Sequence, residues 1–291
     1  MCLLALFFPL PSWAWNSAGH RLIALIAWDH LEPRARSEAA RLLHKHPDFE
    51  RWSKRVTEAD VDRGAFIEAS TWADEIRKDR RFYNAESDAP TPTLSGFPDM
   101  DQHRNWHFVN LKLDGSPFDS PISGLLGKQL VVLTNTLSSS KASSIDRSYA
   151  LPWLIHLVGD AHQPLHTSIQ SKVGGGKETT ISNPFNPRKT KSTLHAFWDD
   201  LPGPPWLRGE RLEATARALI AAYPPPARSN SSDKWLVESW HIAREQGYPT
   251  WQDEGKTISS QFFETSRAIA DRRITEAGYR LADLLNRRLT D

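Results

Sequence analysis

Apolar residues recur every three or four positions along most of the chain, which is the spacing of one face of an α-helix. This periodicity predicts helices over residues 19–31, 34–46, 65–80, 121–137, 148–163, 194–200, 209–222, 232–246 and 258–287. The strict alternation of apolar and polar residues that is typical of half-buried strands forms no convincing ladder. We therefore expect an all-α, mostly helical fold.

The segments between these helices have different patterns. Residues 57–60, Thr-Glu-Ala-Asp, predict a short acidic helix start, and residues 106–110 predict a short extended segment. Residues 83–101 are rich in Pro, Ser and Asp and predict a surface loop. Residues 171–192 contain three consecutive glycines and two Asn-Pro pairs, and long loops of this kind often shape a substrate cleft. The sequence has no internal repeat and no block of like charges, so we expect a single domain.

The first fourteen residues form an apolar run that ends in Ser12-Trp13-Ala14, a pattern typical of the cleavage site of an export signal. This run is too short to span a bilayer. The usual Lys or Arg at its start is missing, which is compatible with a start codon further upstream. The sequence therefore predicts a signal peptide over residues 1–14, a mature domain over residues 15–291 and a secreted or periplasmic location. The alternative is an N-terminal apolar strand or helix.

Composition limits the possible functions further. The formal net charge is +1, which excludes the global positive field of duplex-DNA binders, so any binding of nucleic acid needs a local site. The only cysteine is Cys2, inside the predicted signal, so the mature chain would have neither disulfides nor thiolate metal ligands. The length suffices for a sizeable core, to which we assign most of the twelve tryptophans.

The segment from His156 to His166, His-Leu-Val-Gly-Asp-Ala-His-Gln-Pro-Leu-His, places three candidate metal ligands within eleven residues. His156 and Asp160 are four residues apart and would share one face of a helix. The Gln-Pro pair then bends or ends that helix, so His166 would leave in a new direction. His195 and Asp199 repeat the four-residue spacing. Imidazole and carboxylate ligands suit zinc, and two such pairs together predict a site with several metal ions.

The remaining histidines of the mature chain are expected to be core residues or to be exposed, because a single histidine on an apolar helix face is usually a satisfied core residue. These are His30, His44, His46, His103, His162 and His241. His103 and His162 lie near the motifs, so an alternative for them is to support the ligand residues from outside.

Other short motifs accompany the histidine-rich segment, and together they resemble one known family. The motifs are Trp15–His20, Ser70–Arg77, Trp106–Phe108, His156–His166, His195–Asp199, Trp235–Ser239 and Ala277–Ala282 with Asn286. The whole mature chain resembles the zinc-dependent, single-strand-specific nucleases and 3′-nucleotidases of fungi, plants and bacteria. The members of that family have the same fold as bacterial zinc-dependent phospholipase C, and both have a cleft that holds three zinc ions.

The resemblance implies three zinc ions per chain. The implied ligand sets are Asp74, His107, His156 and a bridging Asp160; Trp15, His20 and the same Asp160; and His166, His195 and Asp199. Trp15 would bind through its carbonyl oxygen and its free amino group, which requires cleavage of the signal directly before it.

The resemblance also implies roles for residues around the metals. Asp74 would position the attacking hydroxide. Arg77 would stabilise negative charge on the phosphoryl oxygens, or would instead only form a salt bridge. Phe108 would stack on a base, or would instead pack in the core beside His107. Asn110 belongs to the same candidate substrate site, but many family members carry Asp there, which is a better charge partner.

The function that the resemblance implies is hydrolysis of single-stranded DNA and RNA by a secreted or periplasmic endonuclease that leaves 5′-phosphates and also acts on 3′-nucleotides. Such a protein is expected to be a monomer with no transmembrane segment and no stable protein partner. One alternative is a zinc-dependent phospholipase C, and another is a non-catalytic zinc-binding helical protein. Asp74, Arg77 and Asp160 argue against the latter, because a structural zinc site needs no additional groups.

Overall fold

We describe the protein from a computed structural model, and the described residues are 15–56, 59–114, 123–170, 174–228 and 231–290. The predicted signal peptide over residues 1–14 lies outside these ranges. So do residues 57 and 58 of the predicted acidic helix start, residues 121 and 122 of the predicted helix over 121–137, and residues 171–173 of the Gly-rich loop.

The described residues form a mostly helical single domain, which confirms the fold class expected from the sequence. Its helices are α1 (Ser17–Asp29), α2 (Pro33–His44), α3 (Phe49–Ser53), α4 (Val61–Ala69), α5 (Trp72–Glu75), α6 (Leu126–Ser138), α7 (Ser144–Ala161), α8 (Leu194–Asp200), α9 (Gly209–Ala222), α10 (Ser232–Ile242) and α11 (Ser260–Arg288). Strand β1 (Leu111–Lys112) pairs in parallel with β2 (Ser168–Ile169), and β3 (Thr180–Ser182) pairs antiparallel with β4 (Lys191–Thr193). No helix in the described part of the chain is long and apolar enough to cross a membrane.

The single helix predicted over residues 65–80 is wrong, because the chain breaks at Ser70 and Thr71 between α4 and α5. The Ser70 hydroxyl donates to the carbonyl of Ile67 at 2.6 Å, and the Thr71 hydroxyl donates to the carbonyl of Glu68 at 3.0 Å. Side chains that bond to nearby carbonyls in this way offer the backbone an alternative to a continuous helix. Asp74 lies in the short helix α5 that follows this break.

Other boundaries also differ from the sequence prediction. The segment predicted as extended over residues 106–110 follows a 3-10 turn over Arg104–Trp106, and strand β1 begins only at Leu111. The predicted loop over residues 171–192 contains β3 and most of β4. The helix predicted over 232–246 widens into a π-helical turn at Ala243–Gly247. Helix α3 carries too short a pattern to be predicted, and α7 starts at Ser144, earlier than expected, because Ser143 and Asp146 form a capping box.

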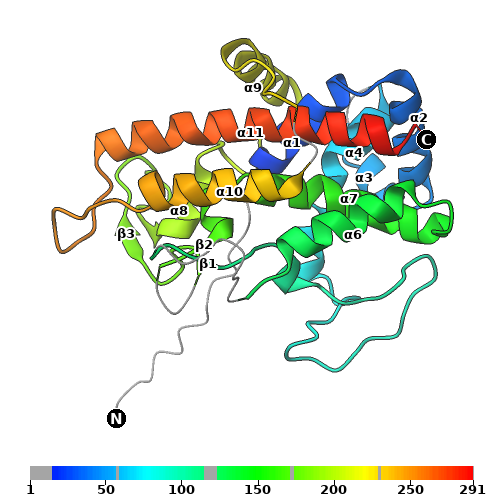
Figure 1. Cartoon of the computed structure of the whole chain (residues 1–291), viewed down its shortest axis with the longest axis horizontal. Coiled ribbons are helices and arrows are strands. Elements are labelled where there is room, and N and C mark those ends of the chain that lie inside the picture. Colours follow the sequence, from blue (N-terminus) through cyan, green and yellow to red (C-terminus); the bar gives the residue numbers. More distant parts are fainter. Residues whose placement is uncertain (1–14, 57–58, 115–122, 171–173, 229–230, 291) are drawn as a thin grey trace.

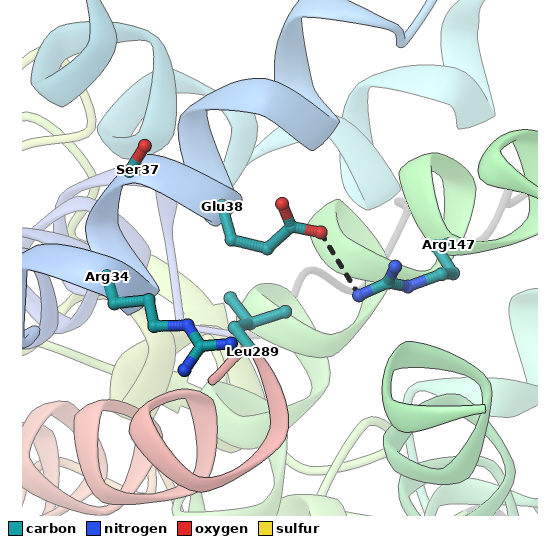
Figure 2. Close-up of a pocket in the computed structure, with 5 residues that line it drawn as sticks. All are labelled: Arg34, Ser37, Glu38, Arg147 and Leu289. Carbon is teal, nitrogen blue, oxygen red and sulfur yellow. Dashed lines mark ion pairs between the residues drawn. The ribbon is translucent and has the colours of Figure 1, made fainter. Parts of the chain in front are cut away.

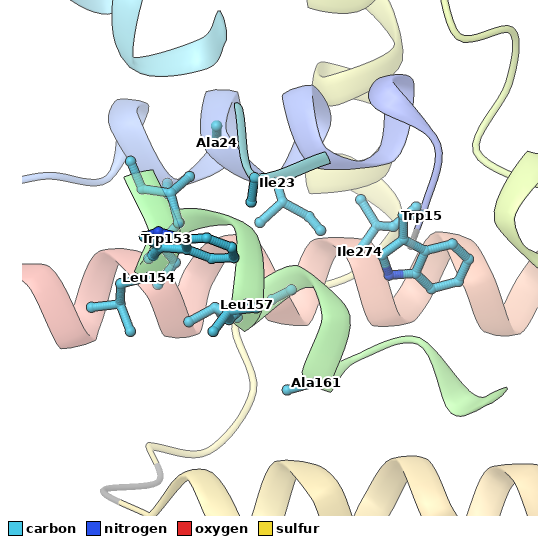
Figure 3. Packing of buried hydrophobic residues seen from close by; sticks show 14 of the residues in the cluster. Trp15, Ile23, Ala24, Trp153, Leu154, Leu157, Ala161 and Ile274 are labelled. Atoms are coloured by element: carbon cyan, nitrogen blue, oxygen red, sulfur yellow. The ribbon is translucent and has the colours of Figure 1, made fainter. Parts of the chain in front are cut away.

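Helices α1 and α7 form the centre of the protein. Figure 1 shows α11 along the length of the molecule, with α10 and α7 on one side and α9 on the other. Helix α1 packs against α11, α4, α9 and α7, and its residues are buried from Ala18 to Trp28. Figure 3 shows Ile23 of α1, Leu157 of α7 and Ile274 of α11 meeting in one apolar cluster.

Most of the tryptophans belong to the core, as the sequence predicts. The buried ones are Trp15, Trp28, Trp52, Trp72, Trp153, Trp198, Trp235 and Trp240. Among the described tryptophans, Trp106 and Trp251 are partly buried, and 58% of the surface of Trp206 is exposed.

The end of α11 meets α2 and the start of α7 around a small surface pocket, where Arg147 pairs with Glu38 at 3.1 Å (Figure 2).

Candidate metal centre

The eight side chains predicted as metal ligands are all buried and lie in three groups that could each hold a metal ion. The groups are His20, His156 and Asp160; Asp74, His107 and His156; and His166, His195 and Asp199. Helix α7 supplies His156 and Asp160 from one face, and the turn after Pro164 supplies His166. The other ligands come from α1, α5, α8 and the segment before β1, so the complete fold fixes the arrangement.

The first two groups are neighbours because both include His156. His107 Nδ1 lies 3.0 Å from Asp160 Oδ2 and 3.1 Å from His156 Nε2, and His156 Nε2 lies 3.4 Å from Asp160 Oδ2. Asp74 is 3.9 Å from both imidazoles, and His20 Nε2 is 3.6 Å from Asp160 Oδ1. Ligand atoms around one tetrahedral zinc lie about 3.3 Å apart, since each bond measures about 2.0–2.2 Å. The observed separations therefore match the spacing of metal ligands, and Asp160 offers one oxygen to each group.

Backbone carbonyls determine which ring nitrogen of three histidines faces the centre. His156 Nδ1 donates to the carbonyl of Ser70 at 2.8 Å, His166 Nδ1 to that of His107 at 2.6 Å, and His195 Nδ1 to that of Gly175 at 2.6 Å. A carbonyl only accepts, so each Nδ1 carries the proton and each Nε2 keeps its lone pair. Supporting bonds of this kind orient histidines that bind metals.

Buried polar atoms without partners provide a direct test of whether the residues fit metal ions. Among the predicted ligand side chains, the buried atoms without a hydrogen-bond partner include His20 Nδ1 and Nε2, Asp74 Oδ1, His107 Nε2, Asp160 Oδ1 and His166 Nε2. Leaving one buried polar group unsatisfied costs about 1–3 kcal/mol. A cluster of nitrogen and oxygen donors in this state fits cations, which would satisfy several of them at once.

Burial shifts the pKa values of these groups in opposite directions. It lowers the pKa of His20 and of His107 well below the usual range, and lowers that of His166 to about 3. It raises the pKa of Asp160 and of Asp199 well above the usual range. The protein alone therefore offers neutral imidazoles with available lone pairs, together with carboxylates that need a nearby positive charge to ionise.

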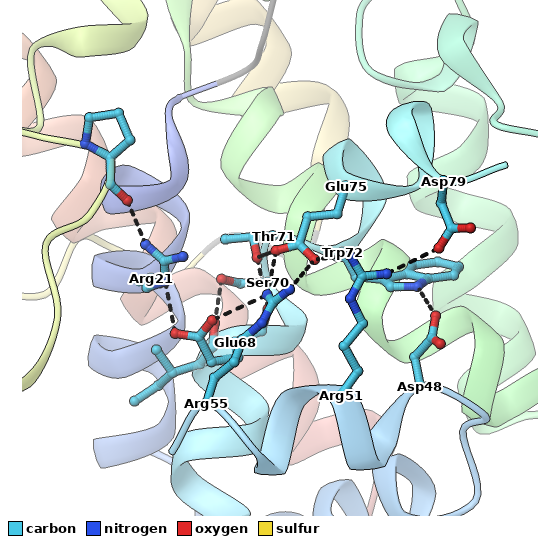
Figure 4. Close-up of polar contacts among 12 residues, drawn as sticks. Arg21, Asp48, Arg51, Arg55, Glu68, Ser70, Thr71, Trp72, Glu75 and Asp79 are labelled. Carbon is cyan, nitrogen blue, oxygen red and sulfur yellow. Dashed lines mark hydrogen bonds and ion pairs between the residues drawn. The ribbon is translucent and has the colours of Figure 1, made fainter. Parts of the chain in front are cut away.

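Arg77 and a larger ionic network flank Asp74. Arg77 Nη2 lies 3.3 Å from Asp74 Oδ1 in the turn after α5. The buried Glu68 lies 3.0 Å from Arg21, and Arg55 lies 3.5 Å from Glu68 and 2.6 Å from Glu75. Figure 4 shows these side chains side by side. Glu75 follows Asp74, and Arg21 follows His20. The network therefore ties the His20 end of α1 to the segment that carries Asp74.

Phe108 and Asn110 are both near the Gly-rich loop. The ammonium group of Lys177 lies 5.1 Å from the centre of the Phe108 ring, within the range of cation–π attraction. Asn110 Nδ2 donates to the hydroxyl of Ser123 at 2.7 Å, and its amide group lies directly against the Cα of Gly174.

Lys177 is a candidate substrate residue that the sequence analysis missed. Burial, followed by the nearby Arg77, lowers the pKa of Lys177, and the carboxylate of Asp199 opposes this shift. Lys177 is two residues from Gly175, whose carbonyl accepts from His195 at 2.6 Å, so this lysine lies beside the third ligand group. A lysine directly after three glycines was the available signal, but it becomes meaningful only when the loop is seen to fold over the centre.

Trp15 is buried beside this centre. The backbone N–H of Asn16 donates to the carbonyl of Asp199 at 3.0 Å, and the Asn16 side chain caps α1 and also bonds to Asp200 at 3.1 Å. The start of the described chain is therefore held against the end of α8, next to the third ligand group.

The other histidines are core or surface residues, as expected. His46 packs on Trp52, and His162 donates to the carbonyl of Val158 and accepts from Arg280. His103 stacks on Trp106 and lies 3.0 Å from both Asp99 and Asp101. His30 bonds to the carbonyl of Ile26, and His44 and His241 lie at the surface.

A buried centre of three histidine and carboxylate groups on a helical scaffold, each able to hold a metal ion, is the arrangement of a metal-dependent protein. A model of the S1/P1 nuclease family matches residues 15–290, so the chain belongs to this family. It is 26% identical to Endonuclease 1 of Arabidopsis thaliana over 96% of this chain and 88% of the relative. It is 24% identical to Endonuclease 5 of the same plant, over 80% and 81%, and 24% identical to Nuclease P1 of Penicillium citrinum, over 71% and 66%.

Gly159 allows a test of the shared ligand groups. A Cβ atom at this position would lie 2.8 Å from His20 Nδ1 and 3.0 Å from its Cε1. We expect Gly159→Ala to displace the His20 ring and to lower the bound metal content per chain, while circular dichroism shows that the helical content is retained. In the control, Gly127→Ala, the new Cβ meets only the flexible end of Leu236 at 2.9 Å. Equal metal content in Gly159→Ala and the unmodified protein would contradict this prediction.

Proposed function

We propose that the protein is a three-zinc endonuclease that hydrolyses phosphodiester bonds of single-stranded DNA and RNA, leaves 5′-phosphates and also removes phosphate from 3′-nucleotides. The observation that carries this proposal is the contact between two buried ligand groups through His156, with Asp160 reaching both and Arg77 beside them. The family is metal-dependent, and its relatives are named as endonucleases and nucleases. Nitrogen and oxygen ligands at tetrahedral spacing favour zinc.

The residues around the metal ligands suit hydrolysis of an anionic ester. Zinc, when bound, lowers the pKa of water and neutralises charge that develops on a phosphoryl group. In the proposed reaction, Asp74 accepts a hydrogen bond from the attacking water and orients it. Arg77 donates to the phosphoryl oxygens, and Lys177 adds a second positive charge on the side of Phe108. Asn110 borders the same side and would contact the substrate base.

Selectivity for single strands is proposed to depend on Phe108. An aromatic face binds an unpaired base by stacking, whereas a base in a duplex is already stacked and paired. Family membership favours nucleic acid over the phospholipid substrates considered from the sequence. The presence of Arg77 beside Asp74 favours catalysis over a purely structural metal site.

An activity panel with metal analysis tests the whole proposal. We expect about three zinc ions per mature chain, rapid hydrolysis of single-stranded DNA and RNA, slower hydrolysis of duplex DNA, release of phosphate from 3′-AMP and no hydrolysis of phosphatidylcholine. Chelation should abolish activity and lower the melting temperature, because metal binding stabilises the folded state. Active protein with one or no bound metal, or equal rates on single and double strands at matched salt, would reject it.

The substitution Asp74→Asn tests whether Asp74 contributes to catalysis independently of folding. The variant keeps the size of the side chain but weakens its hold on metal and water, so we expect turnover to fall roughly 10²-fold or more with the helical fold intact. Asp233→Asn, an exposed change in the first turn of α10, is the matched control and should retain full turnover. Near-normal turnover of Asp74→Asn would show that its proposed role is wrong.

The N-terminus provides an independent test of the second zinc site. We propose that the signal is cleaved before Trp15 and that the freed amino group binds zinc, because an amide nitrogen is a very poor ligand. Protein that carries one extra residue before Trp15 should contain about one zinc ion fewer and be nearly inactive. Protein with one extra residue after Asp291 is the control. Equal zinc content and activity in the two extended proteins would refute this assignment.

A further inference from the structure

A buried glutamine, Gln163, lies between two segments that carry the third ligand group. It precedes the turn Pro164–Thr167, which contains His166, and its side chain is fully buried. Asp199 belongs to α8, 36 residues further along the chain. The amide group of Gln163 bonds to both segments, so a single side chain links two members of the group.

Two hydrogen bonds fix the orientation of the Gln163 amide. Its Oε1 accepts from the backbone N–H of Leu165 at 2.5 Å, and its Nε2 donates to Asp199 Oδ1 at 2.7 Å. A backbone N–H only donates and therefore requires the oxygen of the amide, which leaves the NH₂ group for the carboxylate. Exchanging the two ends of the amide would place two donors against each other at Leu165.

The bond from Gln163 distinguishes the two oxygens of Asp199. Oδ1 accepts from the amide, whereas Oδ2 lies 3.6 Å from His195 Nε2. That distance is close to the separation of about 3.3 Å between the ligand atoms of one tetrahedral zinc. Without the amide, rotation about the Cβ–Cγ bond of Asp199 could turn either oxygen toward the centre.

Asp199 is held differently from the two histidines of its group. His166 and His195 each donate from Nδ1 to a backbone carbonyl at 2.6 Å, whereas Asp199 accepts from a side chain. Burial raises the pKa of Asp199 well above its usual range, and the hydrogen bond from Gln163 opposes this rise. The amide therefore also favours the ionised carboxylate, which is the form that binds metal ions.

We propose that Gln163 is a positioning residue for the third metal ion, which holds Asp199 so that Oδ2 binds the ion together with His166 and His195. The proposal rests on the three-zinc function proposed above. Supporting hydrogen bonds to metal ligands typically contribute roughly 10–100-fold to metal affinity. Because the amide bonds to Asp199 and Leu165, its loss should weaken the third ion and spare the two ions that share His156 and Asp160.

The test compares zinc binding by two variants of the same turn. Gln163→Met is similar in length and loses the bond to Asp199, so we expect about one zinc ion per chain to bind roughly 10–100-fold more weakly in competition with a chromophoric chelator. The other two ions should keep their affinity. The matched control is Thr167→Val, which removes the bond from the Thr167 hydroxyl to the carbonyl of Pro164 at 2.9 Å and should keep all three affinities.

Melting curves of the zinc-free variants check folding, and we expect them to match the curve of the unmodified protein. If Gln163→Met does not fold, Gln163→Glu replaces it. This variant keeps an oxygen for the N–H of Leu165 but places a second oxygen against Asp199 Oδ1, so the same loss is expected.

The outcomes distinguish this proposal from the function on which it rests. If the unmodified protein binds one zinc ion or none, the three-zinc proposal fails and this one fails with it. If the unmodified protein binds about three ions and the Gln163 variant keeps all three affinities, or loses no more than Thr167→Val, the positioning role is refuted. The three-zinc proposal then stands without it.

Discussion

The structure depends on how the protein keeps a cluster of imidazoles and carboxylates buried. Asp160 is fully buried between His20, His107 and His156, and Asp74 adds a second carboxylate nearby. Two anions in such a place repel each other and lose their hydration, so the charged form requires compensating positive charge. Metal ions satisfy this requirement. The same groups that are unfavourable when buried without a cation therefore favour metal binding, which would link metal binding to folding.

Irregular backbone, rather than regular helix, orients much of this cluster. The carbonyls that hold His156, His166 and His195 belong to Ser70, His107 and Gly175, which lie at a helix break, after a short turn and in a glycine-rich loop. Carbonyls inside a regular helix already accept helical N–H groups, so the protein uses residues whose carbonyls are available. The break between α4 and α5 thus leaves the Ser70 carbonyl available to His156. The network around Glu68 then stabilises the break from its other side.

The helical class could be predicted from the sequence because it depends on local spacing, whereas the full set of candidate ligands followed from the resemblance to a family; the structure brings their side chains together in three groups. His156 and Asp160 share a helix face whatever the rest of the fold does. The break at Ser70 was not predictable in this way, because its acceptor role depends on His156, 86 residues away. Lys177 was missed for a similar reason, since only the folded loop brings it to Phe108. Whether the grouped residues bind zinc remains a prediction from resemblance, supported by their spacing and unsatisfied atoms.

The near-neutral charge of the chain and a polyanionic substrate are compatible because the relevant cations are local. The net charge of +1 provides no general attraction for a duplex. Arg77 and Lys177 nevertheless lie beside the candidate metal ligands. Cations concentrated in this way act over a Debye length of about 8 Å at physiological salt. Two cations concentrated at the candidate metal centre can therefore attract a phosphodiester there while the chain as a whole stays nearly neutral.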